Sequence, residues 1–274
     1  MATVKNMLGH TLDLLGEAIV AGRYPPGGAI PPEAVLGEEF GVSRTVIREA
    51  IKSLVAKGMI STGPKVGTRV LAADEWNWFD PQVVSWQSKI GLTHDFVRDL
   101  QELRRVVEPA AVRLAAQRAS AADLAELESA FAGMKQAIEH GGDYVTHDLR
   151  FHQGLLKACH NRMVIQMAKA MGALLRTSFE ISTAKPNGPA SSLGMHRAVL
   201  DAVVARQPEK AERAILKLID SAGEDMELVL STRRKLPSLA SPAPRLRPPL
   251  HPVAGTERHP ARKTKMRVPK THLR

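Results

Sequence analysis

The stretch from Glu33 to Val70 constrains the fold of this chain more than any other. It contains a short helical pattern, a Gly41-Val42-Ser43 turn, a second helical pattern from Arg44, and a hairpin marked by glycine and proline. Gly41 allows a sharp corner between the helices, and Ser43 can cap the second helix by accepting a hydrogen bond from a free backbone N–H. This order of elements is typical of a winged helix-turn-helix.

The second helix has two distinct faces when its residues are placed about 100° apart. The apolar face is formed by Ile47, Ala50, Ile51 and Leu54. The adjoining polar arc carries Arg44, Thr45, Arg48 and Lys52. An arginine near the start of such a helix can bond guanine O6 and N7 together, whereas Lys52 lies farther along and suits a phosphate. The arc predicts a DNA-reading surface, with plain solvated charges as the alternative.

The hairpin that follows this helix predicts a wing. Two short extended runs surround a turn that contains Gly63, Pro64 and Gly67. Such a hairpin can bring Lys65 and Gly67 to the DNA backbone or the minor groove. A hairpin alone is weak evidence for DNA binding, but beside the helix-turn-helix it favours that function.

From Trp76 onward the sequence shows helical periodicity, and strand-like alternation is nowhere sustained. The expected helices span 95–118, 120–140, 143–159, 161–183, 190–206 and 208–232. All three tryptophans fall in an aromatic linker at 73–92, where we expect packing between domains, with ligand stacking as the alternative. The sequence thus predicts a mainly α protein in which an all-helical bundle follows the winged helix-turn-helix.

The net charge of +10 is concentrated near the C-terminus. Residues 237–274 hold nine lysines or arginines against Glu257 alone, together with many prolines and few large apolar residues. Such a composition cannot form a packed core, so we expect a basic, Pro-rich disordered tail at 233–274. The tail could add sequence-independent affinity for DNA phosphates, or it could have no role.

Two further features bear on the compartment of the protein. No apolar run approaches the roughly 20 residues that a membrane span needs, and the N-terminus lacks the pattern of a signal peptide. The single cysteine, Cys159, falls on an apolar helix face, which favours a buried hydrophobic residue over a reactive thiol. We therefore expect a cytoplasmic protein with no membrane partner.

Three metal-ligand types occupy positions that the helical pattern assigns to the core. Asp148 and His152 are four residues apart at the centre of an apolar arc, and His196 lies on the inward face of another helix. Buried carboxylate and imidazole groups need partners, which a structural Asp–His hydrogen bond or a divalent cation would supply. The coincidence of three favours zinc or a similar first-row metal. Three protein ligands would leave positions open for water or for a small organic acid.

Arg104 is also placed on the apolar side of its helix. There its guanidinium could bind the carboxylate of an effector. Equally, Glu108 lies four residues on and could pair with it inside the helix. The sequence leaves both interpretations open.

Taken together, these motifs resemble the GntR family of bacterial transcription regulators, in its FadR-like branch with an all-helical FCD effector domain. The resemblance covers roughly residues 5–232 and is carried by 40–50, Glu102-Leu103-Arg104-Arg105-Val106-Val107-Glu108, Asp148-x3-His152 with Asn161, and His196. It implies a homodimer that binds double-stranded operator DNA and a small organic acid, such as the aldonic acid galactonate. In the common metal pattern of that family a further histidine comes from the last helix, but the matching position here is Leu218.

On this basis we divide the chain into four parts. They are a winged helix-turn-helix DNA-binding domain at 1–72, the aromatic linker at 73–92, an effector-binding and dimerisation domain at 93–232, and the tail at 233–274. The predicted function is a DNA-binding transcriptional repressor of sugar-acid catabolism genes, released from its operator by the acid, although activation remains an alternative. Two rival functions are a metal-dependent enzyme acting on a small acid and a tail-driven, non-specific DNA binder.

Overall fold

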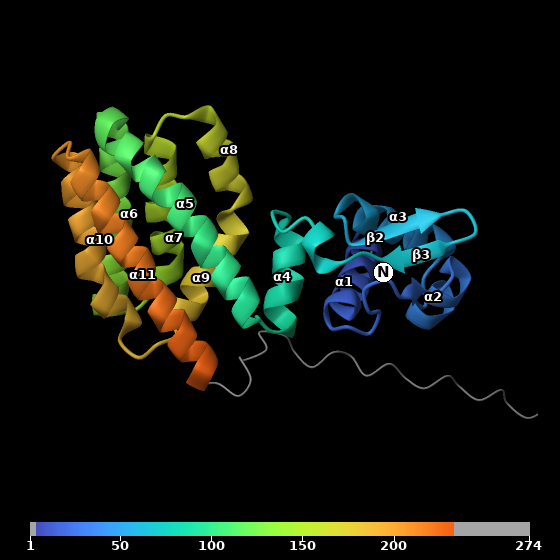
Figure 1. The fold of residues 1–274 in the computed structure, drawn as a ribbon. Helices are drawn as coiled ribbons and strands as arrows, with labels where there is room; N and C mark the ends of the chain where they lie inside the picture. The colour runs from blue at the N-terminus through green and yellow to red at the C-terminus, as the bar shows by residue number, and fades with distance from the viewer. Residues whose placement is uncertain (1–3, 233–274) are drawn as a thin grey trace, which may run out of the picture. The chain divides into compact units, whose positions relative to one another are not determined.

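The computed structural model describes residues 4–232, so the predicted disordered tail lies outside the described part of the chain. The N-terminal elements form a winged helix-turn-helix (Figure 1). They are α1 (Val4–Val20), β1 (Ala29–Ile30), α2 (Glu33–Phe40), α3 (Arg44–Ala56), β2 (Ile60–Gly63) and β3 (Gly67–Val70). The three strands form an antiparallel sheet in the order β1-β3-β2, and Gly63 pairs with Gly67 next to the tip of the hairpin.

The local signals in the sequence act as predicted at the start of α3. Gly41 ends α2 in the left-handed region with φ of 65°, and the Ser43 side chain accepts a hydrogen bond from the backbone N–H of Val46 at 3.4 Å. The predicted apolar face is buried, and it comprises Ile47, Ala50, Ile51 and Leu54. This face packs into a core that also contains Leu15 of α1. The opposite face of α3 is therefore left at the surface.

The prediction of an aromatic linker at 73–92 missed a helix. A short 3-10 turn, η1 (Ala73–Glu75), is followed by α4 (Pro81–Ile90), which Asp80 caps by accepting a hydrogen bond from the N–H of Gln82 at 2.9 Å. A capping aspartate before a proline is a good helix start, but its signal was hidden among aromatic residues. Trp76 and Trp86 are buried in the same core as α1. This core belongs to the N-terminal part of the chain, so the two side chains pack there, and packing between domains stays a prediction.

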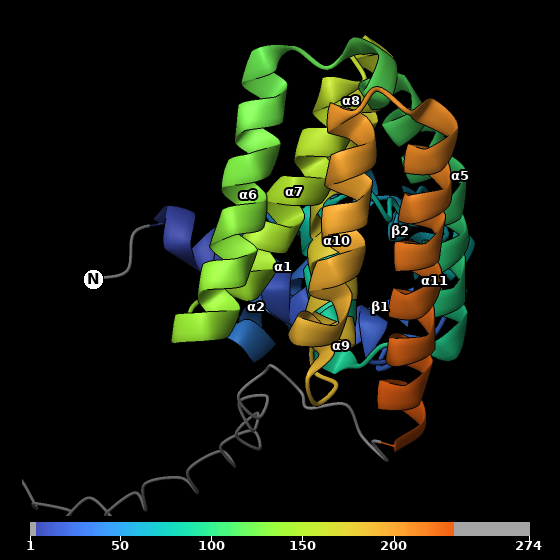
Figure 2. The ribbon, with the colours of Figure 1, turned by 90° about the vertical axis from the view of Figure 1, so that its left-hand side faces the viewer.

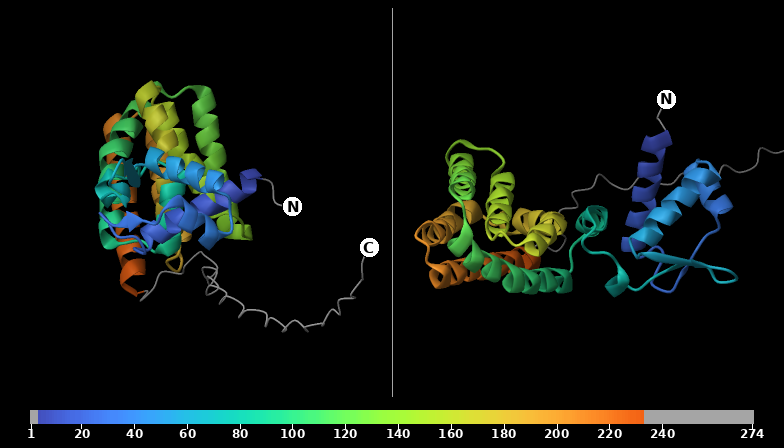
Figure 3. Two further views of the ribbon diagram at one scale, coloured as in Figure 1. Left: turned by 90° about the vertical axis from the view of Figure 1, so that its right-hand side faces the viewer. Right: turned by 90° about the horizontal axis from the view of Figure 1, so that it is seen from above.

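The rest of the described chain is a helical bundle, in which helices from distant parts of the sequence lie side by side (Figures 2 and 3). Its elements are α5 (His94–Arg118), α6 (Ala121–His140), α7 (Tyr144–Ala158), α8 (Arg162–Ala170), α9 (Gly172–Ser182), α10 (Gly188–Val204) and α11 (Pro208–Thr232). Ser120 and Asp123 form a capping box at the start of α6. The main core lies where α5, α6, α7, α10 and α11 meet, and Cys159 is buried in a smaller cluster, as predicted.

The prediction of one helix over 161–183 was wrong, because the structure divides it into α8 and α9 at Met171. The apolar pattern runs through this point, so periodicity alone gives no sign of a break. Gly172 follows directly, and glycine weakens helices because it loses the most conformational freedom on folding. Among residues 4–232, no helix is both long and apolar enough to cross a membrane.

Replacement of Gly16 by alanine tests the packing of α4 against α1. A Cβ at this position would lie 2.5 Å from Cε3 of Trp86, which is buried. Alanine gains roughly 1 kcal/mol of helix propensity, but overpacking in a close-packed core costs about 1–3 kcal/mol and should prevail. We expect Gly16→Ala to lower the free energy of unfolding, measured in urea by fluorescence of the tryptophans.

The matched control is Gly9→Ala in the same helix, where an added Cβ meets no atom within 4 Å. This substitution should stabilise the domain by about 0.5–1 kcal/mol. Equal effects of the two substitutions would contradict the close approach of Trp86 to α1.

Candidate metal centre and nucleic-acid interface

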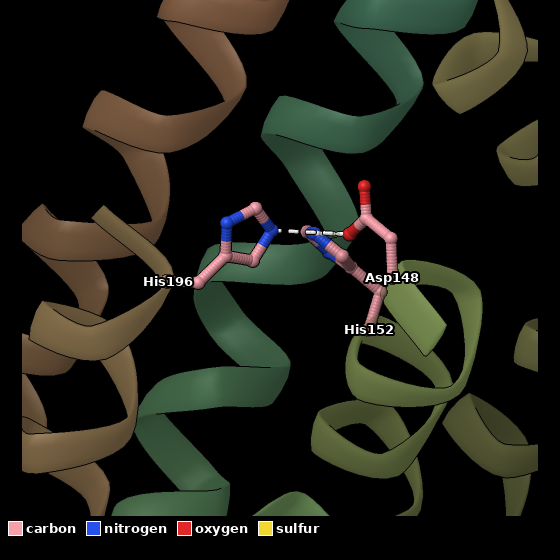
Figure 4. A group of neighbouring side chains, drawn as sticks. All are labelled: Asp148, His152 and His196. Atoms are coloured by element: carbon pink, nitrogen blue, oxygen red, sulfur yellow. Dashed lines mark hydrogen bonds and ion pairs between the residues drawn. The ribbon is translucent and has the colours of Figure 1, made fainter. Parts of the chain in front are cut away.

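The three predicted metal ligands meet inside the helical bundle. Asp148 and His152 stand one turn apart on α7, and His196 comes from α10. All three are buried, and Figure 4 shows their side chains pointing toward one another. Each offers one ligand atom, and these atoms lie within 4.8 Å of one another. The structure thus forms a buried Asp/His/His group that could hold a metal ion, and Asp148, His152 and His196 are called the metal group below.

The outer nitrogens of both histidines are fixed by neighbours that can only accept hydrogen bonds. Nδ1 of His196 lies 2.9 Å from the carbonyl oxygen of Ser192, and Nδ1 of His152 lies 2.6 Å from Oε2 of Glu108. Both Nδ1 atoms must therefore carry a proton and donate it.

As a result, both Nε2 atoms are directed at the same carboxylate oxygen. Oδ1 of Asp148 lies 3.0 Å from Nε2 of His196 and 3.4 Å from Nε2 of His152. If both imidazoles were neutral, three lone-pair-bearing atoms would converge in a buried site, which is unfavourable. Either extra protons or a cation must lie among them, so the donor set fits a metal.

Charge also favours the ionised form of Asp148. Burial acts to raise the pKa of its carboxyl, but His196, His152 and Arg104 outweigh that effect and hold the pKa below its ordinary value. A carboxylate that stays ionised can ligate a cation without first losing a proton.

Of the two interpretations that the sequence left open for Arg104, the structure shows the pairing with Glu108, and effector binding stays a prediction. Its Nε donates to Oε1 of Glu108 at 2.7 Å, its Nη1 donates to Oγ of Ser178 at 2.9 Å, and its guanidinium lies 5.0 Å from the centre of the Phe179 ring. Arg104 also lines the same cavity as the three predicted metal ligands. It is thus paired within its helix and still faces the site.

Glu108 connects Arg104 to the metal group, a role that the sequence did not reveal. One of its carboxylate oxygens accepts from Arg104 and the other from His152. Burial alone would raise the pKa of the Glu108 carboxyl, but Arg104 and His152 prevail and lower it to about 2. The spacing from Arg104 was visible in the sequence, whereas the contact with His152 depends on the packing of α5 against α7.

The cavity beside this group is small, with a volume of about 20 Å³. Leu218 of α11 lines it at the position where the family resemblance would supply a further histidine. Two further acidic residues of the bundle, Asp220 and Glu180, do not line the cavity, and 48% and 38% of their side-chain surface is accessible to solvent. Among the described residues that line the cavity, only Asp148, His152 and His196 bring metal-ligating atoms close together.

The six predicted DNA-contacting residues are all exposed on α3 and the hairpin, and they are Arg44, Thr45, Arg48, Lys52, Lys65 and Gly67. Three of them, Arg48, Lys52 and Gly67, line one groove between the helix and the hairpin. The groove does not include Arg44, Thr45 or Lys65.

Two acidic residues hold basic side chains of this surface in the free protein. Nη2 of Arg48 lies 3.0 Å from Oε2 of Glu33 on α2, and Nζ of Lys52 lies 2.8 Å from Oε1 of Glu49. Both pairs are solvent-exposed, so they contribute little to stability and can exchange for other partners.

Comparison with known proteins decides the family. The sequence profile of bacterial regulatory proteins of the gntR family matches residues 9–70, and that of the FCD domain matches residues 99–221. The galactonate operon transcriptional repressor of Escherichia coli K12 is 36% identical over 210 residues, which cover 76% of this chain and 91% of that protein. This chain belongs to the GntR family.

Other relatives are more distant. The probable D-xylose utilization operon transcriptional repressor of Paenarthrobacter nicotinovorans is 28% identical over 74% of this chain and 81% of its own length. A solved structure titled as Lar, which controls the expression of the Listeria monocytogenes agr system, superposes with a TM-score of 0.60 at 19% identity. It covers 83% of this chain and 98% of that structure, and supports the fold alone.

Membership in the family confirms several expectations from the sequence. This chain is a DNA-binding transcriptional regulator, with an N-terminal winged helix-turn-helix followed by a helical FCD domain. Its relatives are transcription regulators and not enzymes, which removes the metal-dependent enzyme as a rival.

Replacement of Glu108 by glutamine should lower stability in a pH-dependent manner. At pH 7 the variant would leave Arg104 buried beside an uncharged amide, at a cost of about 3–5 kcal/mol in free energy of unfolding. The folded-state pKa of the carboxyl, about 2, lies below its ordinary value of 4.5, so its stabilisation is complete above pH 4.5 and is lost as the pH falls toward 2. The difference between wild type and variant should therefore narrow below pH 4.5.

Urea denaturation of the metal-free protein between pH 3 and pH 7 measures this difference. Glu102→Gln, at an exposed position of the same helix, is the control and should change stability by less than about 0.5 kcal/mol. A Glu108→Gln effect that stays constant over the whole pH range would rule out the charged pairing.

Proposed function

We propose that this GntR regulator represses sugar-acid catabolism genes and leaves its operator when an aldonic acid such as galactonate binds the FCD domain. The name of the Escherichia coli relative supports the choice of acid. The single observation that carries the proposal is the convergence of Asp148, His152 and His196 beside Arg104 in one cavity. That cavity combines groups suited to a cation with a guanidinium suited to a carboxylate.

We further propose that Asp148, His152 and His196 hold a divalent first-row metal, zinc or a similar ion. Two imidazole nitrogens and one carboxylate oxygen suit such ions, although they do not select one. Leu218 cannot ligate, so three protein ligands would leave coordination positions for oxygens of the acid. When bound, the metal would supply a fixed positive charge that binds the carboxylate and an adjacent hydroxyl.

For DNA recognition we propose a homodimer in which each copy places α3 in the major groove of a roughly palindromic operator. Arg44, Thr45 and Arg48 would read base edges, because they lie in the first turns of the helix. A second group, Lys52, Lys65 and Gly67, would mainly position the protein on the phosphates.

In this proposal the pair between Arg48 and Glu33 acts as a holding contact. It orients the guanidinium over the groove in the free protein and yields to a guanine when DNA binds. Because the pair is exposed, its exchange costs little. The carboxylate of Glu33 would also repel a DNA phosphate placed next to it. DNA that binds in the wrong register would therefore be bound with lower affinity.

The acid and the operator would act antagonistically. If the acid prefers a domain arrangement that does not fit the operator, each ligand weakens the binding of the other by the same factor. Repression in the acid-free state and induction by the acid follow from this coupling. These events would take place in the cytoplasm, where the operator lies.

Titration of galactonate into the zinc-loaded protein, followed by thermal unfolding, tests the acid and metal proposals together. At about 100 times the dissociation constant, a ligand stabilises the folded state by roughly 2.7 kcal/mol. We expect a rise in Tm that His196→Ala abolishes, because that substitution removes a metal ligand.

His160→Ala is the matched control, since this histidine is about half exposed and lies outside the metal group. It should keep the response to galactonate. If neither galactonate nor related aldonic acids raise the Tm of the wild type, the effector class is wrong.

Substitution of Arg48 by alanine tests base reading by α3. Loss of a bidentate contact with guanine should cost about 1–3 kcal/mol, or roughly tenfold to a hundredfold in affinity, and should relax base preference at one operator position. Fluorescence anisotropy on operator DNA recovered by selection, and on its single-base variants, measures both effects.

Arg98→Ala offers a control, because Arg98 is as exposed as Arg48 and also forms ion pairs, but lies on α5. It should leave operator binding unchanged. An unaltered base preference in Arg48→Ala would count against the proposed orientation of α3 in the groove.

A further inference from the structure

A second acidic residue lines the cavity, apart from the metal group. On α11, the residues Leu218, Ser221, Ala222 and Asp225 follow one another at helical spacing and all face the cavity. Leu218 and Asp225 are seven residues apart, which corresponds to a rise of about 10 Å along the helix. Asp225 does not belong to the group whose ligand atoms converge within 4.8 Å. The cavity therefore offers a carboxylate at a point separate from the metal ligands.

Asp225 is bound by a cation from a different element. It is buried, and Oδ1 accepts from Nζ of Lys185, which lies in the segment 183–187 between α9 and α10. The side chain of Lys185 is one-third exposed, so it can turn to water if Asp225 finds another partner. The carboxylate has no such freedom, because a buried charge needs a replacement donor.

The size of the cavity requires one wall to move when an organic acid enters. A volume of about 20 Å³ accommodates one water molecule and not a six-carbon acid. Among the described lining residues, Thr183 alone lies outside a helix, in the segment that carries Lys185. The hydroxyl of Thr183 donates to the carbonyl oxygen of Phe179 in the preceding helix α9, whereas Lys185 donates to Asp225 of α11. The ion pair with Asp225 thus ties the irregular wall of the cavity to α11.

We propose that Asp225 determines specificity for a polyhydroxylated acid, by exchanging Lys185 for hydroxyl groups of the ligand. This inference rests on the proposed function, which places the carboxylate of the acid at Arg104 and the metal group. The distal hydroxyls would then donate to the two oxygens of Asp225, with the Ser221 hydroxyl beside them.

The chemistry of this exchange selects among acids. A short hydroxy acid has no distal hydroxyl group to donate to Asp225. With such an acid bound, Asp225 would keep its ion pair with Lys185 and would make no contact with the ligand. A second carboxylate at the distal end would be repelled by Asp225. A monocarboxylic acid with a chain of hydroxyls satisfies both ends, because each buried polar group then has a partner.

Isothermal titration calorimetry on the zinc-loaded, full-length protein tests the proposal with two acids, galactonate and lactate. Lactate carries a carboxylate and a 2-hydroxyl but no distal hydroxyls. We expect Asp225→Ala to weaken galactonate binding at least about tenfold, the usual effect of losing hydrogen bonds to a charged group. The affinities for lactate and for zinc should change by less than about twofold. Asp225→Asn, which keeps the shape of the side chain, should give an intermediate loss for galactonate.

Asp220→Ala is the matched control, because Asp220 lies on the same helix, half exposed and paired with Arg105 outside the cavity. It should leave galactonate binding unchanged. Lys185→Met removes the competing cation, so it should speed galactonate association, measured by stopped-flow fluorescence, without weakening affinity.

The possible results separate the two proposals. If the wild type binds galactonate and Asp225→Ala either has no effect or weakens both acids equally, the specificity role fails and the proposed function stands. A tenfold loss of galactonate affinity in Lys185→Met would assign the contact to Lys185 and overturn the role of Asp225. If the wild type binds neither acid, the proposed function fails, and the specificity role fails with it.

Discussion

The candidate metal site of the FCD domain is organised around one shared carboxylate oxygen, Oδ1 of Asp148, which lies 3.0 Å from Nε2 of His196 and 3.4 Å from Nε2 of His152. The opposite nitrogens are fixed by acceptors on α5 and α10, so neither ring can turn to another partner without losing a buried hydrogen bond. The interior of the domain therefore presents Nε2 of both histidines and Oδ1 of Asp148 in a fixed arrangement. Such preorganisation favours a cation over any neutral ligand.

A connected polar network extends from this centre through the bundle. Glu108 joins His152 of α7 to Arg104 of α5, and Arg104 in turn reaches Ser178 of α9. Both Nδ1 atoms and both oxygens of Glu108 have hydrogen-bond partners within the described residues, as buried polar groups require. A charged effector in the cavity would therefore interact electrostatically with residues of α5, α7 and α9 together. Such an effector could favour one arrangement of the domain over another.

Local patterns in the sequence predicted those features that depend on neighbouring residues. The apolar face of α3, the cap at Ser43, the i, i+4 pair of Asp148 with His152 and the inward phase of His196 all follow from helical periodicity. The bond between Glu108 and His152 joins residues 44 positions apart, and the tie between Lys185 and Asp225 joins residues 40 apart. Periodicity within one helix contains no information about such pairs. The break at Met171 escaped prediction because the apolar pattern continues through it, and the single Gly172 is a weak sign of a helix end.

The central claim is that the buried Asp/His/His group holds a metal, and the metal content of the purified full-length protein tests it most directly. Elemental analysis by mass spectrometry, after dialysis against zinc and then metal-free buffer, should give about one ion per chain for the wild type. Asp148→Asn, which keeps the volume of the side chain but removes its charge, should give close to none. A wild type that retains no zinc, manganese, cobalt or nickel, and yet binds galactonate with the same affinity in the presence of a chelator, would contradict the account.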